Sequence, residues 1–248
     1  PGMFFIVQIG AVVSALVLFY QFRKLRQPIS IEERTVVEDY VPTVILVSAV
    51  VLLILASFLP NKPRNINGYI CVGLFLIGLL REVFKKRFAF IKATIKEIDY
   101  FTLLLLAGLF IVIAGITEAG VITEVSRLFV RISNNNVFAM YSLLVWASVV
   151  LSAFIDNIPY VATMLPVTAG IAQIMGVNPT VLYFGLLAGA TLGGNLTPIG
   201  ASANIAGLGI LRKEGYEVKA QEFMKISVPF TLAAVLSGYV LIWLFWGI

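Results

Sequence analysis

The sequence predicts an all-α, polytopic membrane protein, and three observations lead to that class. Of the 248 residues, 60% are hydrophobic and 12% are charged, whereas soluble domains average about 45–50% apolar and about 25% charged residues. The apolar residues form runs near the length of roughly 20 residues that a helix needs to cross a bilayer. Two runs are broken by polar, proline-containing segments, which hydrocarbon tolerates only where protein or a polar cavity covers the freed backbone.

The predicted membrane segments follow one another along the chain. They are residues 3–20, 41–60, 66–81, 100–117, 137–176, 178–212 and 222–247. The segment 66–81 is short, which leaves an extension at its C-terminal end open. Segment 118–132 instead spaces charged residues among apolar ones, a pattern typical of an amphipathic helix in the membrane interface. Those charged residues are Glu118, Glu124, Arg127 and Arg131.

The first residues do not form a signal peptide. The chain starts at Pro1 and is apolar from Met3 onward, without a basic region or a small-residue cleavage site. This beginning also differs from a natural start, so we expect the chain to be a fragment of a longer protein.

Basic residues concentrate in three predicted loops. Loop 21–40 carries four Lys or Arg residues, loop 81–99 carries six and loop 212–225 carries four, of 18 in the chain. Because short cytoplasmic loops are enriched in Lys and Arg, we expect loops 21–40, 81–99 and 212–222 to be cytoplasmic, in a prokaryotic plasma membrane. The net charge of +5 then reflects loop asymmetry across a bilayer and not a nucleic-acid-binding surface.

The loop charges constrain segment 137–176. The loops alternate correctly across the membrane only if this segment enters and leaves on the same, external side. It is interrupted at residues 155–159 by the sequence Ile-Asp-Asn-Ile-Pro. We therefore predict a re-entrant helical hairpin with its tip at residues 156–159.

Asp156 differs from every other acidic residue of the chain. The other twelve of the 13 acidic residues fall in predicted loops or at segment ends. A carboxylate at the bilayer centre costs at least about 2.5–3.5 kcal/mol, so it needs a partner, a proton, a cation or a water-filled cavity. Apart from Arg212 at the end of the second, neither broken segment contains a basic residue. Two interpretations stay open: a structural cap of the second hairpin arm, where Pro159 suits an early helical position, or a cation or proton site that also caps.

The second interruption, GGNLTPIGASAN, covers residues 193–204 inside an apolar run. Glycine allows close backbone approach, Pro198 prevents the helix from continuing, and neutral side chains supply donors and acceptors. The half-helix that restarts near Ala201 directs a positive dipole end into the gap, while the one that ends near Gly193 exposes carbonyl oxygens that can coordinate Na⁺. A proline kink repaired by neighbouring helices is the alternative.

The two interruptions supply the candidate residues for binding an ion or substrate. They are Asp156, Asn157, Gly193, Gly194, Asn195, Thr197, Gly200, Ser202 and Asn204. A coupling Na⁺, if there is one, is expected near Asp156, Asn157 and Asn195, and no other cofactor is expected.

The residue counts also argue against an intramembrane enzyme. The chain has no histidine and a single cysteine, Cys71, which excludes histidine metal sites, Ser-His triads, zinc or rhomboid-like proteases and an intrachain disulfide. An aspartyl protease needs two membrane carboxylates, and the broken segments offer one. We therefore expect no enzymatic activity.

Both interruptions resemble segments of a known superfamily. The sequences are SAFIDNIPYVATMLPV (152–167) and LAGATLGGNLTPIGASANIAG (187–207), and GYEVKAQEFMKISVPF (215–230) continues the likeness. They are similar to the ion transporter superfamily, within it to arsenical-pump and NhaD-type permeases with a citrate-transporter-like domain, and especially to P protein-like members. The resemblance covers residues 100–248 well and the rest loosely.

The resemblance implies two inverted repeats, each with a re-entrant hairpin and a broken helix, in a homodimer that works by an elevator motion. Because the chain holds one hairpin and one such break, it resembles the second repeat preceded by the last helix of the first. A weak internal sequence similarity agrees with this interpretation. Aligning Pro1 with Pro229 also pairs Val7 with Val235, Gly10 with Gly238, Val12 with Val240 and Leu16 with Leu244.

The expected organisation follows from that resemblance. Residues 1–20 are the last helix of a missing first repeat, residues 21–40 are a cytoplasmic linker and residues 41–248 are the C-terminal transport repeat. This repeat consists of scaffold helices (41–117), the interfacial helix (118–132), the hairpin (137–176), the broken helix (178–212) and the last helix (222–247).

The resemblance also implies a function: secondary active transport of a small ion or oxyanion, coupled to Na⁺ or H⁺. An arsenite- or carboxylate-type anion and Na⁺/H⁺ exchange all fit. Dicarboxylate carriers of the superfamily have Ser-Asn-Thr at the tip where this chain has Asp156 and Asn157, and a carboxylate there repels an anion unless a cation is bound beside it. A passive anion channel is the alternative. The expected partners are the small ion, the lipid bilayer, the missing N-terminal repeat and a second copy, and no nucleic acid.

Overall fold

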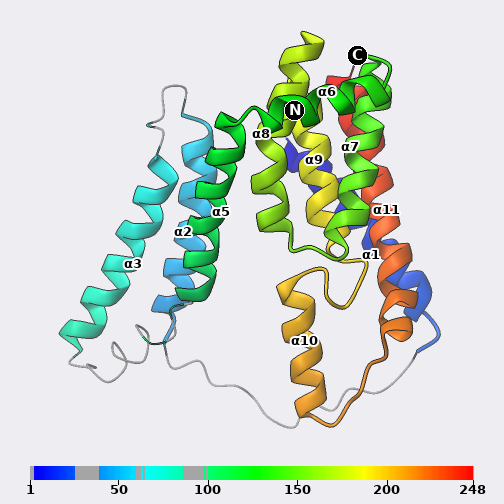
Figure 1. Ribbon diagram of the computed structural model, residues 1–248. Helices are drawn as coiled ribbons and strands as arrows, with labels where there is room; N and C mark the ends of the chain where they lie inside the picture. The colour runs from blue at the N-terminus through cyan, green and yellow to red at the C-terminus, as the bar shows by residue number, and fades with distance from the viewer. Residues whose placement is uncertain are drawn as a thin grey trace. The chain divides into compact units, whose positions relative to one another are not determined.

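The structure, a computed structural model, is all-helical in the residues that it describes, which confirms the predicted fold class (Figure 1). These residues are 3–25, 39–59, 63, 65–85, 96, 98 and 100–247. The chain divides into two units. One unit consists of residues 1–27 and 103–248, and the other consists of residues 28–102.

The smaller unit contains two apolar helices that pack side by side, α2 (Val41–Ser57) and α3 (Ile66–Phe84). They correspond to two of the predicted membrane segments. The apolar run of the second segment was short, and its helix does extend at the C-terminal end. The two helices therefore agree in number and order with the sequence prediction.

An ion-pair network closes one end of the smaller unit. Arg81 near the end of α3 pairs with Asp39, which precedes α2, and with Glu82 at 2.8 Å. Lys85 lies 3.5 Å from the same Asp39 carboxylate. The hydrogen bond from the Arg81 guanidinium lowers the pKa of Asp39 to about 2, so this carboxylate is charged at neutral pH.

The larger unit contains most of the described helices. They are α1 (Met3–Phe22), α5 (Tyr100–Glu118), α6 (Val121–Ile132), α7 (Val137–Ser152), α8 (Asn157–Met175), α9 (Thr180–Gly193), α10 (Ser202–Lys213) and α11 (Ala220–Trp246). Helix α9 packs against α7, α8 and α11, while α11 also packs along α1. The centre of this core is formed by fully buried side chains, among them Tyr141, Leu144, Ile171, Leu182 and Ile242.

Glycine allows α7 and α9 to approach each other closely. A Cβ atom on Gly189 would lie 2.4 Å from the Val145 carbonyl oxygen, and one on Gly193 would lie 2.5 Å from the Val149 carbonyl oxygen. No side chain fits at either position without moving a helix backbone. This is the small-residue packing that brings membrane helices together.

Helix α6 is the amphipathic helix that the charge spacing predicts, although it is shorter than the predicted segment because α5 continues to Glu118. It begins after Gly120, whose φ is +77°, and makes a bend of 115° with α7. On its buried face, the Ser126 hydroxyl donates to the Val167 carbonyl of α8 at 3.0 Å. On its exposed face, Arg127 pairs with Glu124 at 2.6 Å. Its location in the membrane interface stays a prediction.

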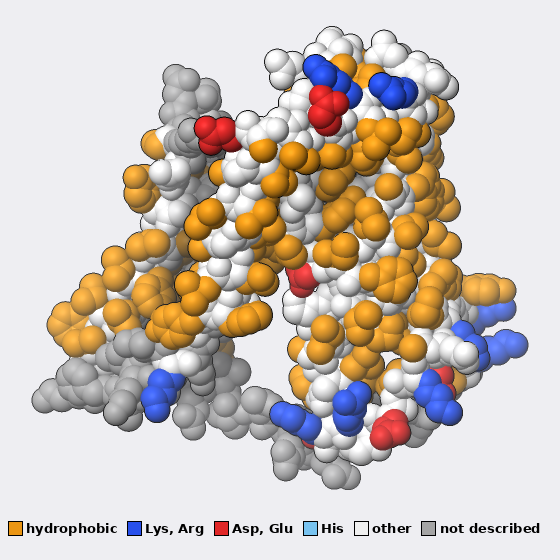
Figure 2. Space-filling model, in the orientation of Figure 1, with side chains coloured by type: hydrophobic (Ala, Val, Ile, Leu, Met, Phe, Trp, Pro, Cys, Tyr) orange, Lys and Arg blue, Asp and Glu red, His pale blue; other side chains and the backbone are white. Residues whose placement is uncertain are grey.

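Five of the described helices are long and apolar enough to cross a membrane: α1, α3, α5, α8 and α11. Helices α2 and α9 are apolar but shorter. Figure 2 shows hydrophobic side chains along the helices and charged side chains gathered mainly near helix ends. This distribution is the one expected for a polytopic membrane protein.

Both predicted interruptions are present. Helices α7 and α8 are separated by residues 153–156, and α9 and α10 are separated by residues 194–201. In Figure 1 the chain descends through α7, turns, and returns through α8, while α10 continues beyond the end of α9. The last predicted segment forms α11, which holds Pro229 inside the helix.

Part of the predicted organisation lies outside the described residues. This applies to Pro1 and its pairing with Pro229, and to most of the basic loops 21–40 and 81–99. The sidedness of the loops and the division into repeats therefore stay predictions.

Candidate functional site

The hairpin tip is built around Asp156. Helix α7 ends at Ser152, and Asp156 is the N-cap of α8, with its Oδ1 accepting a hydrogen bond from the Ile158 N–H at 3.1 Å. Pro159 follows in the first turn of α8, where its missing N–H costs nothing. The capping role predicted for Asp156 is therefore confirmed, and it leaves part of the carboxylate for other partners.

The helix break is closed by Asn204. Its amide nitrogen donates to the carbonyl oxygens of Gly194, at 3.0 Å, and Thr197, at 2.9 Å. Helix α9 ends at Gly193, so the regular helical hydrogen bonds stop there, although the Thr197 carbonyl also accepts the Gly200 N–H at 3.4 Å. One side chain thus donates to two backbone carbonyls of the break.

The hairpin tip and the break touch each other. The Ser202 hydroxyl, in the first turn of α10, donates to Asp156 Oδ2 at 2.9 Å. Thr197 is buried and donates its hydroxyl to the Ala153 carbonyl oxygen at the end of α7. A Cβ atom on Gly200 would lie 2.7 Å from that same carbonyl oxygen. Two segments about 45 residues apart in the sequence therefore form one polar contact.

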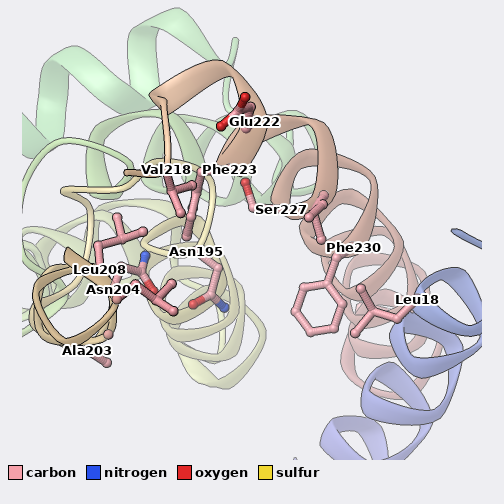
Figure 3. A pocket seen from close by; sticks show the side chains of 13 residues that line it. Leu18, Asn195, Ala203, Asn204, Leu208, Val218, Glu222, Phe223, Ser227 and Phe230 are labelled. Carbon is pink, nitrogen blue, oxygen red and sulfur yellow. The ribbon is translucent and has the colours of Figure 1, made fainter. Parts of the chain in front are cut away.

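Asn195 faces a different space from Asp156. It lines a cavity of about 720 Å³ between α10 and α11, together with Asn204, and Asp156 does not line this cavity. Figure 3 shows the Asn195 side chain between the two helices. Within the described residues, the side chain of Asn157 makes no hydrogen bond. Of the nine candidate residues, four form the tip contact (Asp156, Thr197, Gly200 and Ser202) and two line the cavity (Asn195 and Asn204), while Asn157, Gly193 and Gly194 do neither.

Some polar residues around the site were missed by sequence reasoning. Ser227 of α11 donates to the Leu196 carbonyl in the break at 2.9 Å. Ser152 donates to the Ala190 carbonyl at 2.6 Å, and Ser148 lies 3.1 Å from the Tyr160 hydroxyl. Ser148 and Ser152 are four residues apart, so they share one helix face, and that spacing was the available signal.

The chemistry available at the tip contact is that of oxygen ligands. Asp156 supplies a carboxylate, Ser202 a hydroxyl, and the break supplies backbone carbonyls. Among the described residues, no three Cys, Asp or Glu side chains gather as a metal cluster would require. A hard monovalent cation or a proton suits such a ligand set better than a transition metal.

Comparisons with known proteins find similarity to transporters and to a further membrane protein. A family model described as citrate transporter matches residues 1–189, which include the hairpin and end before the break. An uncharacterized transporter of Mycobacterium tuberculosis is 32% identical over 204 residues, covering 79% of this chain and 45% of the relative. A 46 kDa membrane protein of Mycobacterium leprae is 29% identical over 217 residues, covering 87% and 49%.

A more distant relative is the P protein of Homo sapiens, 28% identical over 194 residues, which cover 75% of this chain and 23% of that protein. No solved structure matches the chain. The chain spans about half the length of the mycobacterial relatives that it matches.

Proposed function

The chain belongs to the citrate transporter family, and we propose that it forms one half of the ion-binding core of a secondary active transporter. The family and the apolar helices make it a multi-pass membrane protein. In our proposal, the cargo is a small ion or oxyanion, either an arsenite- or carboxylate-type anion or Na⁺ exchanged for H⁺. Transport is coupled to Na⁺ or H⁺, and the chain carries out no enzymatic reaction.

The observation that carries the proposal is the contact between Asp156 and Ser202. Asp156 lies in a hydrophobic hairpin, and none of the ion pairs among the described residues includes it. Its two hydrogen bonds come from neutral donors, the Ile158 N–H and the Ser202 hydroxyl. A carboxylate within the membrane needs a partner, a cation, a proton or a water-filled cavity, and in our proposal the coupling ion fills this role at Asp156.

The same contact also supports binding of an oxyanion. Asp156 caps α8 and Ser202 begins α10, so the positive ends of two helix dipoles lie at one place. While Asp156 is charged, it occupies that positive field. Once a cation or proton neutralises it, the helix ends and the neutral donors of Asn157 and the break attract an anion. Coupling between cation and anion follows from this order.

The packing around the contact favours an elevator motion. Thr197 ties the break to the end of α7, and glycine contacts hold α7 against α9. The hairpin and the broken helix then move as one body, as rigid-body alternating access requires. The proposal includes a homodimer, a pseudo-symmetric N-terminal repeat that supplies the other half of the site, and cytoplasmic basic loops in a prokaryotic plasma membrane.

A passive anion channel of the same fold is the alternative function. The polar break and the cavity beside Asn195 would then line a pore. A channel moves its ion only down the electrochemical gradient. Accumulation of the anion against its own gradient, driven by Na⁺ or H⁺, separates the two functions.

The test is transport by the full-length protein in liposomes. A Na⁺ or proton gradient is imposed across the vesicle membrane, and uptake of arsenite, citrate and ²²Na⁺ is measured. We expect Asp156→Asn to abolish ion-coupled uptake, because the amide keeps the cap on Ile158 but takes up no proton and carries no negative charge to attract a cation. Glu124→Gln on the exposed face of α6 is the matched control and keeps wild-type uptake. Coupled uptake by Asp156→Asn at the wild-type rate contradicts the proposal.

A further inference from the structure

The cavity between α10 and α11, here named the α10–α11 chamber, has walls unlike those of the tip contact. Its volume is about 720 Å³, within the range of roughly 300–1,000 Å³ found for small-molecule sites. Most of its lining is apolar and includes Leu18, Leu208, Phe223 and Phe230. Figure 3 shows Phe230 and Leu18 facing each other at one end of the chamber and Glu222 at the other.

The polar groups of the chamber are few. Ser227 and Asn204 already use their donors on backbone carbonyls of the break. The Asn195 amide makes no hydrogen bond within the described residues, so it has both donors and acceptor to offer to a ligand. An apolar cavity with a small number of placed polar groups is the usual form of a site for a small organic molecule.

The charge of the chamber excludes a multiply charged anion. Glu222 is the one charged residue in its lining, and no Lys or Arg of the described residues contributes to it. One oxygen of Glu222 accepts the Lys219 N–H at 3.1 Å, which holds the carboxylate at the start of α11. A di- or tricarboxylate would meet no cation and one repelling charge here. A neutral or positively charged head group is complementary instead.

We propose that the α10–α11 chamber binds a small amphiphile with an aromatic body and a single neutral or cationic head. The body lies against Phe223 and Phe230, while the head reaches Asn195 or Glu222. This site is distinct from the ion contact at Asp156, and it does not depend on the function proposed above.

Binding in the chamber also affects helix α10. None of the side chains of α10 is buried, in contrast to every other described helix of the larger unit. A second cavity, of about 620 Å³, lies on another face of α10, and Leu208 lines both spaces. A ligand in the chamber therefore supplies packing that α10 otherwise lacks, and it holds Asn204 in the position that closes the break.

Three probes that share the same phenylbutyl body and differ only in the head group test the head-group chemistry. They are 4-phenylbutylamine, 4-phenylbutanol and 4-phenylbutanoate, applied to the full-length protein in nanodiscs. Ala203 lines the chamber, so Ala203→Cys is labelled by a small maleimide when the chamber is open, in a background without native cysteines, Cys71 included. We expect the amine and the alcohol to slow this labelling several-fold, and the carboxylate to leave it unchanged.

Two glycines of α10 provide a matched pair of variants. Gly207 lines the chamber and Gly209 lines the second cavity, and a Cβ at either position meets no atom within 4 Å. We expect Gly207→Leu to abolish amine binding in equilibrium dialysis, whereas Gly209→Leu retains it. Glu222→Gln keeps an oxygen for the Lys219 N–H, and we expect it to weaken binding of the amine while binding of the alcohol stays unchanged.

Each alternative outcome overturns the proposal. If no maleimide labels the Ala203→Cys variant even without a probe, another part of the full-length protein fills the chamber. Equal binding to Gly207→Leu and Gly209→Leu, with matching thermal stability, places the ligand elsewhere. Protection by the carboxylate as strong as that by the amine contradicts the inferred head-group selectivity.

Discussion

Single side chains hold the hairpin tip against the helix break. Thr197 is buried and donates to the Ala153 carbonyl, and Ser202 donates to Asp156. Gly200 lies against that same carbonyl with no space for a Cβ atom. The contact therefore depends on the residue type at each of these positions, because no bulky apolar side chain replaces these hydrogen bonds.

We expect Thr197→Val to destabilise the full-length protein by about 1–3 kcal/mol, because the buried Ala153 carbonyl loses its donor while the side-chain volume stays the same. The measurement is thermal unfolding in detergent, with a lower Tm as the expected result. Thr191→Val is the control, since the Thr191 hydroxyl donates to Leu187 within its own helix and is exposed. An equal fall of Tm in both variants contradicts a special role for Thr197.

Asn195 marks the limit of residue-level prediction. Its polarity and its place in the break made it a candidate, and it does lie at a cavity. The sequence grouped it with Asp156, but the structure turns it toward α11. That direction depends on how α11 packs beside the break, where Ser227 meets Leu196. Local sequence carries no information about this long-range contact.

At the scale of elements, glycine spacing determines how the broken helix meets the hairpin. Gly185, Gly189 and Gly193 are four residues apart in α9, so they share one face, and that face lies against α7. The spacing was visible in the sequence, whereas its partner was not. The interruptions themselves were predictable. Unpaired backbone groups are costly in hydrocarbon, so a polar, proline-containing segment inside an apolar run indicates a break that protein or a polar cavity covers.

Gly189→Ala tests this packing, since alanine favours a helix by about 1 kcal/mol over glycine where space is free. The added Cβ would lie 2.4 Å from the Val145 carbonyl oxygen, so we expect a net loss of about 1–3 kcal/mol from overpacking. Gly108→Ala in α5 is the control, because its Cβ meets no atom within 4 Å. The sign of the change in Tm is the readout: a fall for Gly189→Ala and no fall for Gly108→Ala. A rise in both variants means that α7 and α9 are not in close contact.

At the scale of the whole molecule, the hairpin and the basic loops together determine the expected membrane topology. Helices α7 and α8 either return to the side from which they came or cross the bilayer, and the two cases place α9, α10 and α11 in opposite orientations. The return path is visible in Figure 1, where the chain descends through α7 and rises through α8. The basic residues near the ends of α1 and α10 supply the independent argument, because they favour the cytoplasmic side.

Cysteine labelling of the full-length protein in intact cells tests both arguments at once. Four exposed positions are used, each in a background without native cysteines: Arg131, Gln173, Lys24 and Glu214. We expect a membrane-impermeant maleimide to label Arg131→Cys and Gln173→Cys from outside, because they flank a hairpin that enters and leaves on that side. Lys24→Cys and Glu214→Cys become reactive only after the cells are opened, since they lie with the basic residues. Labelling of Arg131→Cys and Gln173→Cys from opposite sides would mean that α7 and α8 together cross the membrane, and the half-site built on a re-entrant tip would then have to be abandoned.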